Sequence, residues 1–177
     1  MKCKLMIYRC LFEEEKYIRL DMRPKYILAL IYAFTDSNNY SQLKQRDISN
    51  MMNITKQNVN DSIRLLERDG FIKRITANGN RGTIKINKPN NKGSIPISRE
   101  LIDGKYQALS KGTKLFYSYY RWVQEQEESD YIKIKGVDIV KRMNESIKSI
   151  QAHCKELEEV GLLQKSKQGN FNTFDFK

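Results

Sequence analysis

The sequence predicts a mainly α-helical protein with small β-hairpins, an α+β fold, built from two copies of one unit. The strongest observation is an internal repeat, in which residues 47–72 align without a gap on residues 138–163, 91 positions later. A repeat of this kind indicates that one supersecondary unit occurs twice. The identical pairs are Asp47/Asp138, Ile48/Ile139, Met52/Met143, Asn53/Asn144, Leu66/Leu157, Glu67/Glu158 and Gly70/Gly161. The second observation is a hairpin pattern that follows each of the two glycines.

The 177 residues divide at this repeat into two units. The match continues upstream, where Lys25 corresponds to Lys114, 89 positions later. Each copy therefore spans most of one half, which is long enough for its own core. The connecting segment is polar and contains proline and glycine, as linkers do. We expect a first unit over residues 1–88, a linker over 89–94 and a second unit over 95–177.

Each unit contains three stretches in which apolar residues recur at helical spacing. Asp21 and Thr55 precede two of these stretches in the first unit, and Ser110 and Ser146 do so in the second. Residues of these types are preferred N-caps. Gly70 and Gly161 stand where a residue in the left-handed conformation ends a helix. The predicted helices cover residues 22–35, 44–52 and 56–69, and then 111–126, 135–143 and 147–160.

A strand–turn–strand pattern follows each of these glycines. In the first unit, Phe71–Ile75 and Thr83–Ile86 flank a turn over residues 78–82 that begins with Asn-Gly, a strong hairpin signal. In the second unit, residues 162–166 and 171–176 flank a turn over 167–170. Three helices followed by a hairpin form a winged helix-turn-helix, so the sequence predicts two in tandem.

A further segment precedes the first helix of each unit, Lys4–Phe12 in one and Ser94–Leu101 in the other. We expect both to be extended strands. In the first unit, such a strand would pair with the wing or with another protomer, and the sequence leaves both open.

The chain is strongly basic, with a net charge of +11. Residues 1–90 carry 17 Lys and Arg against 9 Asp and Glu, a charge of +8, and residues 91–177 carry 15 against 12, a charge of +3. A basic surface of this kind favours a polyanionic partner, most often nucleic acid.

Other functional classes have little support in the sequence. His153 is the only histidine, the three cysteines form no CxxC motif, and the glycines form no phosphate-binding motif. We therefore expect no enzyme, no cofactor and no metal site. No stretch approaches about 18 apolar residues, so we expect no membrane span. The sparse cysteines favour reduced thiols in a cytoplasm.

The third helix of the first unit is the predicted DNA-reading element. With Val59, Ile63 and Leu66 on its buried side, the opposite side carries amide and guanidinium groups, which form bidentate contacts with adenine and guanine. Asp61 would accept from a cytosine amine, or hold Arg64 or Arg68. The candidate DNA-binding residues of this unit are Lys44, Gln45, Arg46, Lys56, Gln57, Asn58, Asp61, Arg64 and Arg68, with Asn80 and Arg81 in the wing.

The third helix of the second unit, with Ile150 on its buried side, exposes fewer groups that read bases. We expect it mainly to contact phosphates. The candidates are Lys148, Ser149, Gln151 and Lys155 in the helix, with Lys165, Lys167 and Gln168 in the wing. The alternative interpretation is a winged helix used only for protein contacts, with its charges forming a solvated face.

The predicted helix over residues 111–126 is crowded with aromatic residues, namely Phe116, Tyr117, Tyr119, Tyr120 and Trp122. Packing in the core or between the two units would account for them. The alternative is a surface through which the protein forms a homodimer.

Parts of both units resemble known families. The segments Gln45–Ser49, Asn53–Val59 and Leu66–Ile72 resemble MarR-type winged-helix regulators, which implies a winged helix that binds DNA. The second unit resembles the N-terminal winged helix of plasmid replication initiators from Gram-positive bacteria. That resemblance rests on Ile95-Pro96, Leu109-Ser110, Lys114–Tyr117, Lys155–Leu163 and Lys167-Gln168-Gly169.

We therefore expect a sequence-specific protein that binds double-stranded DNA, in the role of a transcriptional repressor of a mobile element. The alternative is a replication initiator of a plasmid or phage. A third interpretation, from another class, is a winged-helix interaction protein such as a phage-encoded inhibitor.

Overall fold

The computed structural model describes residues 6–77, 80–87, 93–102, 104–169 and 171–177, without the side chains of 76, 77, 80–82 and 168. The first unit contains β1 (Met6–Tyr8), α1 (Cys10–Glu13), α2 (Glu15–Ile18), α3 (Met22–Ala33), β2 (Tyr40–Ser41), α4 (Gln45–Met52), α5 (Lys56–Arg68), β3 (Ile72–Ala77) and β4 (Asn80–Ile86). The second contains β5 (Ser94–Pro96), α6 (Arg99–Ile102), α7 (Lys111–Gln126), β6 (Ile132–Ile134), α8 (Gly136–Met143), α9 (Ile147–Glu159), β7 (Leu163–Gln168) and β8 (Phe171–Phe176).

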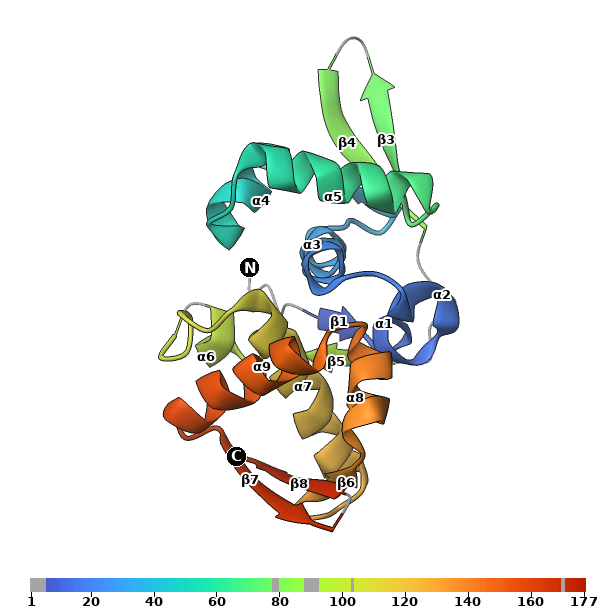
Figure 1. Cartoon of the computed structure of the whole chain (residues 1–177). Helices are drawn as coiled ribbons and strands as arrows, with labels where there is room; N and C mark the ends of the chain where they lie inside the picture. The colour runs from blue at the N-terminus through green and yellow to red at the C-terminus, as the bar shows by residue number, and fades with distance from the viewer. Residues whose placement is uncertain (1–5, 78–79, 88–92, 103, 170) are drawn as a thin grey trace.

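The fold is the predicted mainly α-helical α+β fold with small wings, and the helix-turn-helix pattern occurs twice (Figure 1). The three predicted helices of each unit are α3, α4 and α5, and then α7, α8 and α9. Their observed ends differ from the predicted ends by at most two residues. The turn between the second and third helices passes through Asn53 (φ 49°) in the first unit and Asn144 (φ 55°) in the second. Asparagine tolerates this left-handed conformation better than most residues.

Side-chain caps begin three of the helices, as predicted. The hydroxyl oxygens of Thr55, Ser110 and Ser146 each accept a hydrogen bond from a backbone N–H in the first helical turn. Asp21 occupies the N-cap position of α3 but makes no capping hydrogen bond. Its carboxylate accepts from the Asn144 amide of the second unit instead, at 3.3 Å, so the predicted cap has become an inter-unit contact.

Each wing is a three-stranded antiparallel sheet, in the order β2-β4-β3 in one unit and β6-β8-β7 in the other. The hairpins were predicted, but β2 and β6 were not, because strands of two and three residues give little periodic signal. The first hairpin is longer than predicted: residues 80–82, expected in the turn, belong to β4. A register shift between Ile75 and Thr76 accommodates the additional residue.

The two segments expected to be fully extended are strands only in part. The first turns into α1 at Cys10, and the second turns into α6 at Arg99. The short strands pair with each other: β1 and β5 form an antiparallel ladder with Ile7 opposite Ile95. The partner of the first strand is therefore its counterpart in the repeat, rather than the wing or another protomer.

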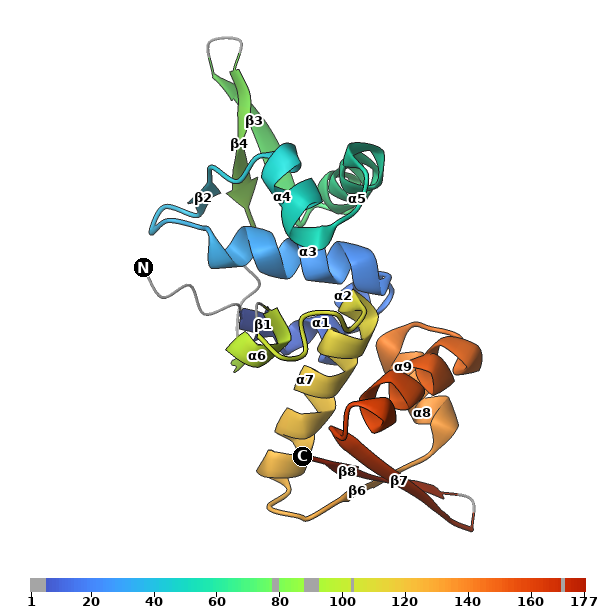
Figure 2. The same cartoon turned by 90° about the vertical axis from the view of Figure 1, so that its left-hand side faces the viewer.

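The two units share one hydrophobic core. Helix α3 of the first unit packs against α7 of the second, and the β1–β5 ladder lies beside both helices (Figures 1 and 2). The aromatic group of α7 contributes to this packing: the rings of Phe12 and Tyr119 lie 4.7 Å apart across the two units, and the guanidinium of Arg9 lies 4.5 Å from the Trp122 ring.

A buried lysine occupies the same place in both units. Lys25 is fully buried and donates from Nζ to the carbonyl of Ile18, at 3.1 Å. Lys114 is 3% exposed and donates to the carbonyl of Gln107, seven positions before it, at 2.7 Å. The bond pairs correspond at the offset of 89, so the repeat extends to a specific polar contact. This contact ties the first long helix of each unit to the segment preceding it.

The helix-turn-helix of the second unit is docked on the first unit. Lys25 also donates to the carbonyl of Met143, at 3.4 Å, and the Asn144 amide donates to the carbonyl of Arg19, at 2.9 Å. Helix α8 contacts α1 and α2. The wings lie at opposite ends of the molecule, with β3–β4 at the top and β7–β8 at the bottom of Figure 1.

Candidate nucleic-acid interface

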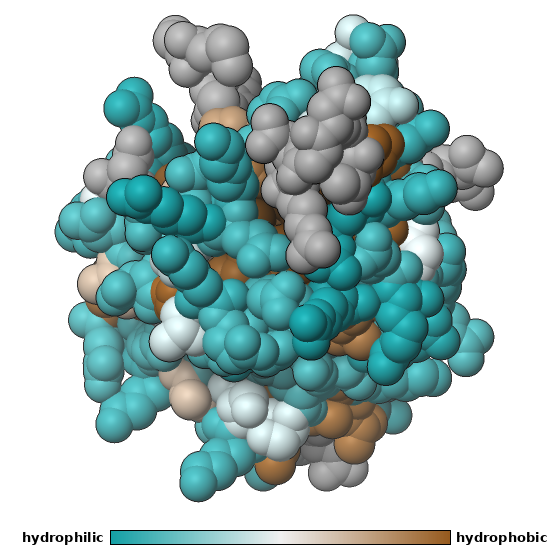
Figure 3. Space-filling model, turned by 90° about the horizontal axis from the view of Figure 1, so that it is seen from above, coloured by the Kyte–Doolittle hydropathy of each residue, from teal (hydrophilic) through white to brown (hydrophobic). Residues whose placement is uncertain are grey.

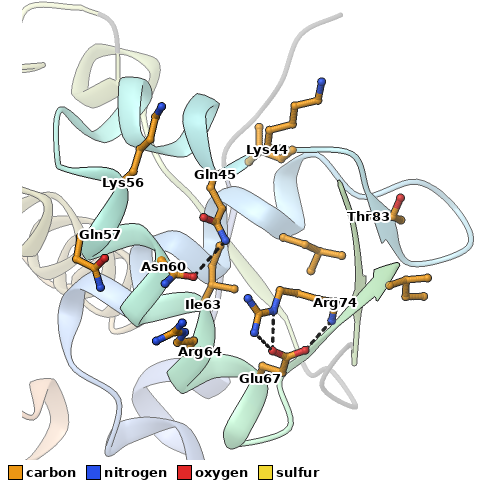
Figure 4. A pocket seen from close by; sticks show the side chains of 13 residues that line it. Lys44, Gln45, Lys56, Gln57, Asn60, Ile63, Arg64, Glu67, Arg74 and Thr83 are labelled. Carbon is orange, nitrogen blue, oxygen red and sulfur yellow. Dashed lines mark hydrogen bonds and ion pairs between the residues drawn. The ribbon is translucent and has the colours of Figure 1, made fainter. Parts of the chain in front are cut away.

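A polar hollow of about 900 Å³ opens on the first unit. It lies between the start of α4, one side of α5 and the wing strands β3 and β4 (Figure 4). Its lining residues are Leu43, Lys44, Gln45, Lys56, Gln57, Asn60, Ile63, Arg64, Glu67, Arg74, Ile75, Thr83 and Ile84. The end of the molecule that carries β3 and β4 is largely hydrophilic (Figure 3).

Helix α5 has the two sides that the sequence predicted. Val59, Ile63 and Leu66 are completely buried. Asn58, at the flank, is half-buried. The candidates on the opposite side of the helix are all exposed, namely Lys56, Gln57, Asp61, Arg64 and Arg68. The amphipathic pattern therefore positions the helix with its polar side away from the core.

The exposed side of α5 divides into two parts. Gln57 and Arg64 line the hollow, whereas Asp61 lines a separate depression with residues of α3 and with Glu145. The Gln57 amide donates to the Asp61 carboxylate at 2.7 Å, so Asp61 orients Gln57. Arg68 pairs with Asp69 at 3.0 Å. The observed partner of Asp61 is therefore Gln57, rather than Arg64 or Arg68 as the sequence suggested.

Asn60 is a polar group of the hollow that sequence reasoning missed. Its side-chain oxygen accepts from the Gln45 amide at 3.5 Å, which links α5 to the first turn of α4. Because Asn60 follows Val59 directly, its side chain leaves α5 between the buried side and the exposed side. The wing lies next to that part of the helix, and the position of the wing cannot be derived from the helical periodicity of the sequence.

Arg74 on β3 is the second such group. Its guanidinium and its backbone N–H both donate to the Glu67 carboxylate, at 2.6 and 3.0 Å. These hydrogen bonds hold the pKa of Glu67 below its usual value. The ion pair fixes a cation at the wing side of the hollow.

The start of α4 contributes cationic and amide side chains. The N–H of Lys44 donates to the Asp47 carboxylate at 3.2 Å, which closes the helix start. Lys44 and Arg46 are exposed and Gln45 is half-buried. The positive end of the helix dipole adds to these cations, and helix starts of this kind bind anions readily. The side chains of Asn80 and Arg81, the wing candidates, lie outside the described residues.

The corresponding face of the second unit is less polar. Lys148, Gln151 and Lys155 on α9 are exposed, and so are Lys165 and Lys167 on the wing. Ser149 is half-buried, and its N–H donates to the capping Ser146. The side chain of Gln168 is outside the described residues.

Apolar side chains occupy several positions of this face that are polar in the first unit. Val137 stands at the position of Arg46 and Ile147 at that of Lys56, both at the offset of 91. Phe171 is equivalent to Asn80, because Phe171 pairs with Gln168 in the second wing as Asn80 pairs with Ala77 in the first. The two units therefore present different chemistry on equivalent surfaces.

The described residues contain no group of three or more His, Cys, Asp or Glu side chains able to hold a metal ion. None of the described helices is long and apolar enough to cross a membrane. His153, the only histidine, is buried in a hydrogen-bonded chain between Thr113, at 2.9 Å, and Glu145, at 2.6 Å.

Comparison with known proteins gave structural likenesses but no family. No protein-family model matches the chain, and no curated protein is significantly similar to it. Among solved structures, it is similar to the mRNA-binding domain of elongation factor SelB from E. coli, solved in complex with SECIS RNA. The likeness covers 85% of this chain and 94% of that one, at 11% identity and a TM-score of 0.27.

Proposed function

We propose that the protein binds double-stranded DNA sequence-specifically through its first unit. The observation that carries this proposal is the polar hollow between α5 and the wing, where Gln57, Asn60 and Arg64 are held beside the start of α4. A third helix of this kind enters the major groove with its N-terminal part towards the bases. The proposal accounts for the charge of +8 on residues 1–90, since phosphate contacts supply much of the affinity for DNA.

The residues divide into base readers and phosphate contacts in this proposal. Arg64 recognises guanine and Gln57 recognises adenine, because their donors and acceptors match those base edges. Asp61 holds the Gln57 amide in a fixed orientation, which supports discrimination between bases. Lys44, Arg46 and Lys56 contact phosphates, with Asn80 and Arg81 in the flanking groove. Lys155, Lys165 and Lys167 of the second unit add basic surface that raises overall affinity.

The biological role that we propose is a transcriptional repressor of a mobile element, in keeping with the resemblance of α4 and α5 to MarR-type regulators. The second candidate is a plasmid or phage replication initiator. It is favoured by the tandem arrangement of two winged helices in one chain and by the resemblance of the second unit to such initiators.

Equivalent residues of the two units provide a matched test. Arg64 and Lys155 occupy the same position of α5 and α9, and both are exposed. In competition binding against single-base variants of a selected site, Arg64→Ala should lose discrimination at one base pair by about 1–3 kcal/mol. Lys155→Ala should weaken binding to all sequences alike. Unchanged discrimination in Arg64→Ala would refute base reading by the first unit.

A further inference from the structure

An apolar patch is exposed on the second unit, formed by Val137, Ile147 and Phe171. Their exposed fractions are 70%, 53% and 41%. Ile147 lies beside Gly136, because a Cβ there would lie 3.7 Å from Ile147 Cδ1 and 3.7 Å from the Asn172 amide. The Phe171 ring lies 5.5 Å from the Nζ of Lys135, the residue before Gly136. Val137 follows Gly136 directly. Three large apolar side chains grouped on a charged protein mark a surface for a partner.

The patch occupies positions at which the two units carry different kinds of side chain. In the first unit the equivalent positions hold Arg46, Lys56 and Asn80, where a winged helix contacts DNA. A valine, an isoleucine and a phenylalanine offer no hydrogen bond to a phosphate. Ala152, near the middle of the exposed side of α9, replaces Asp61 and leaves the surface flatter and more apolar. A protein surface would gain from covering these groups, whereas a phosphate backbone would not.

Lysines surround the patch. Lys135 lies with its Nζ 5.5 Å from the Phe171 ring, and Lys133 and Lys148 are exposed on the neighbouring β6 and α9. Two copies of this surface facing each other would bring like charges together, in a chain with a net charge of +11. Charge complementarity therefore favours an acidic occupant over a second copy.

We propose that this face of the second unit binds an acidic protein segment whose apolar side chains cover Val137, Ile147 and Phe171. Its carboxylates pair with Lys133, Lys135 and Lys148 at the rim. The apolar centre and charged rim reproduce the usual organisation of a protein interface. This inference goes beyond the proposed function: the first unit binds DNA while the second recruits a protein to the same place.

Selection from a random 16-residue peptide library displayed on phage tests the proposal. The bait is the full chain. The counter-bait is the variant Val137→Arg/Ile147→Lys/Phe171→Asn, which places the residues of the first unit on the second. The enriched peptides should contain apolar residues flanked by Asp and Glu. A thermal melt confirms that the triple variant is folded, and Ile147→Lys alone serves as a milder variant.

Affinity measurements on the consensus peptide decide the outcome. Fluorescence anisotropy should give a loss of affinity of about tenfold or more for the triple variant, and a clear loss for Ile147→Lys. The control Val160→Lys changes an exposed apolar residue at the other end of α9 and should bind as the unmodified chain does. The affinity for the peptide should fall as the salt concentration rises, since the rim is charged.

Four results would overturn the proposal. They are enrichment of no peptide, enrichment of peptides that lack acidic residues, equal binding of the consensus peptide to the triple variant, and concentration-dependent dimerisation that the triple variant abolishes. Thymine-rich duplex DNA is a separate arm of the test, because thymine methyl groups also contact apolar side chains. Protection of Ile147 and Phe171 by that duplex in NMR spectra, without protection by the peptide, would assign the patch to DNA instead. The DNA-binding test on Arg64 is unaffected by any of these outcomes.

Discussion

Replacement of Lys25 by methionine should remove a pH-dependent part of the stability. Lys25 is fully buried where the two units meet, and burial lowers the pKa of its amine from 10.5 to about 8. The carboxylates of Glu145 and Asp21 act in the opposite sense, to a smaller extent. At about 1.36 kcal/mol per pKa unit, keeping this amine charged in the folded protein costs about 3.4 kcal/mol at neutral pH.

The direction of the pH dependence follows from the lowered pKa. Between about pH 8 and pH 10.5 the unfolded chain binds more protons at Lys25 than the folded chain does, so raising the pH stabilises the fold. From pH 7 to pH 9 the gain amounts to about 1.3 kcal/mol. The Lys25→Met variant lacks this titration. The free energy of unfolding of the unmodified protein should therefore rise relative to that of the variant over this range.

Urea denaturation at pH 7, 8 and 9 measures this difference. The variant loses the hydrogen bonds to Ile18 and Met143 but is also relieved of the cost of burying the charge, so only the slope with pH is diagnostic. The control Lys105→Met alters an exposed lysine and should leave the pH dependence unchanged. Parallel curves for the unmodified protein and Lys25→Met would refute the burial of this amine between the units.

Three further changes have defined outcomes. Gly112→Ala would place a Cβ 2.6 Å from the buried His153 ring and should cost about 1–3 kcal/mol of stability in urea denaturation; an unchanged midpoint would contradict that packing. Thr55→Ala removes the cap of α5 and should lower stability by about 1 kcal/mol, measured by thermal unfolding. Asp61→Ala frees the Gln57 amide and should reduce discrimination among DNA sequences more than overall affinity, in competition assays; equal losses would exclude an orienting role.

Local rules explain most of what the sequence predicted. Thr55 caps α5, Val59 and Ile63 are buried, and Gly70 adopts φ +78° at the helix end. Each of these outcomes depends on residues within a few positions of one another, so periodicity and capping preferences suffice. The same reasoning applies to the second unit because the repeat preserves the buried positions and the helix-ending glycine.

Contacts between segments that are distant in the sequence could not be predicted from such local rules. The pairing of Ile7 with Ile95 and the hydrogen bond from Lys25 to Met143 join residues from different units. No local pattern specifies either partner, and Lys25 was visible only as a matched residue of the repeat. The set of interface residues predicted from the sequence was incomplete for a similar reason. Asn60 and Arg74 border the hollow only because the wing folds back beside α5.

Selection from a random DNA library with the purified full chain is the most direct test of the central claim. The unmodified protein should enrich one site, and Gln57→Ala/Arg64→Ala should relax or lose preference at specific base pairs of that site. Ile147→Lys, which alters the second unit only, should enrich the same site as the unmodified protein. Enrichment of no sequence, or of an identical site by Gln57→Ala/Arg64→Ala, would contradict DNA reading by α5.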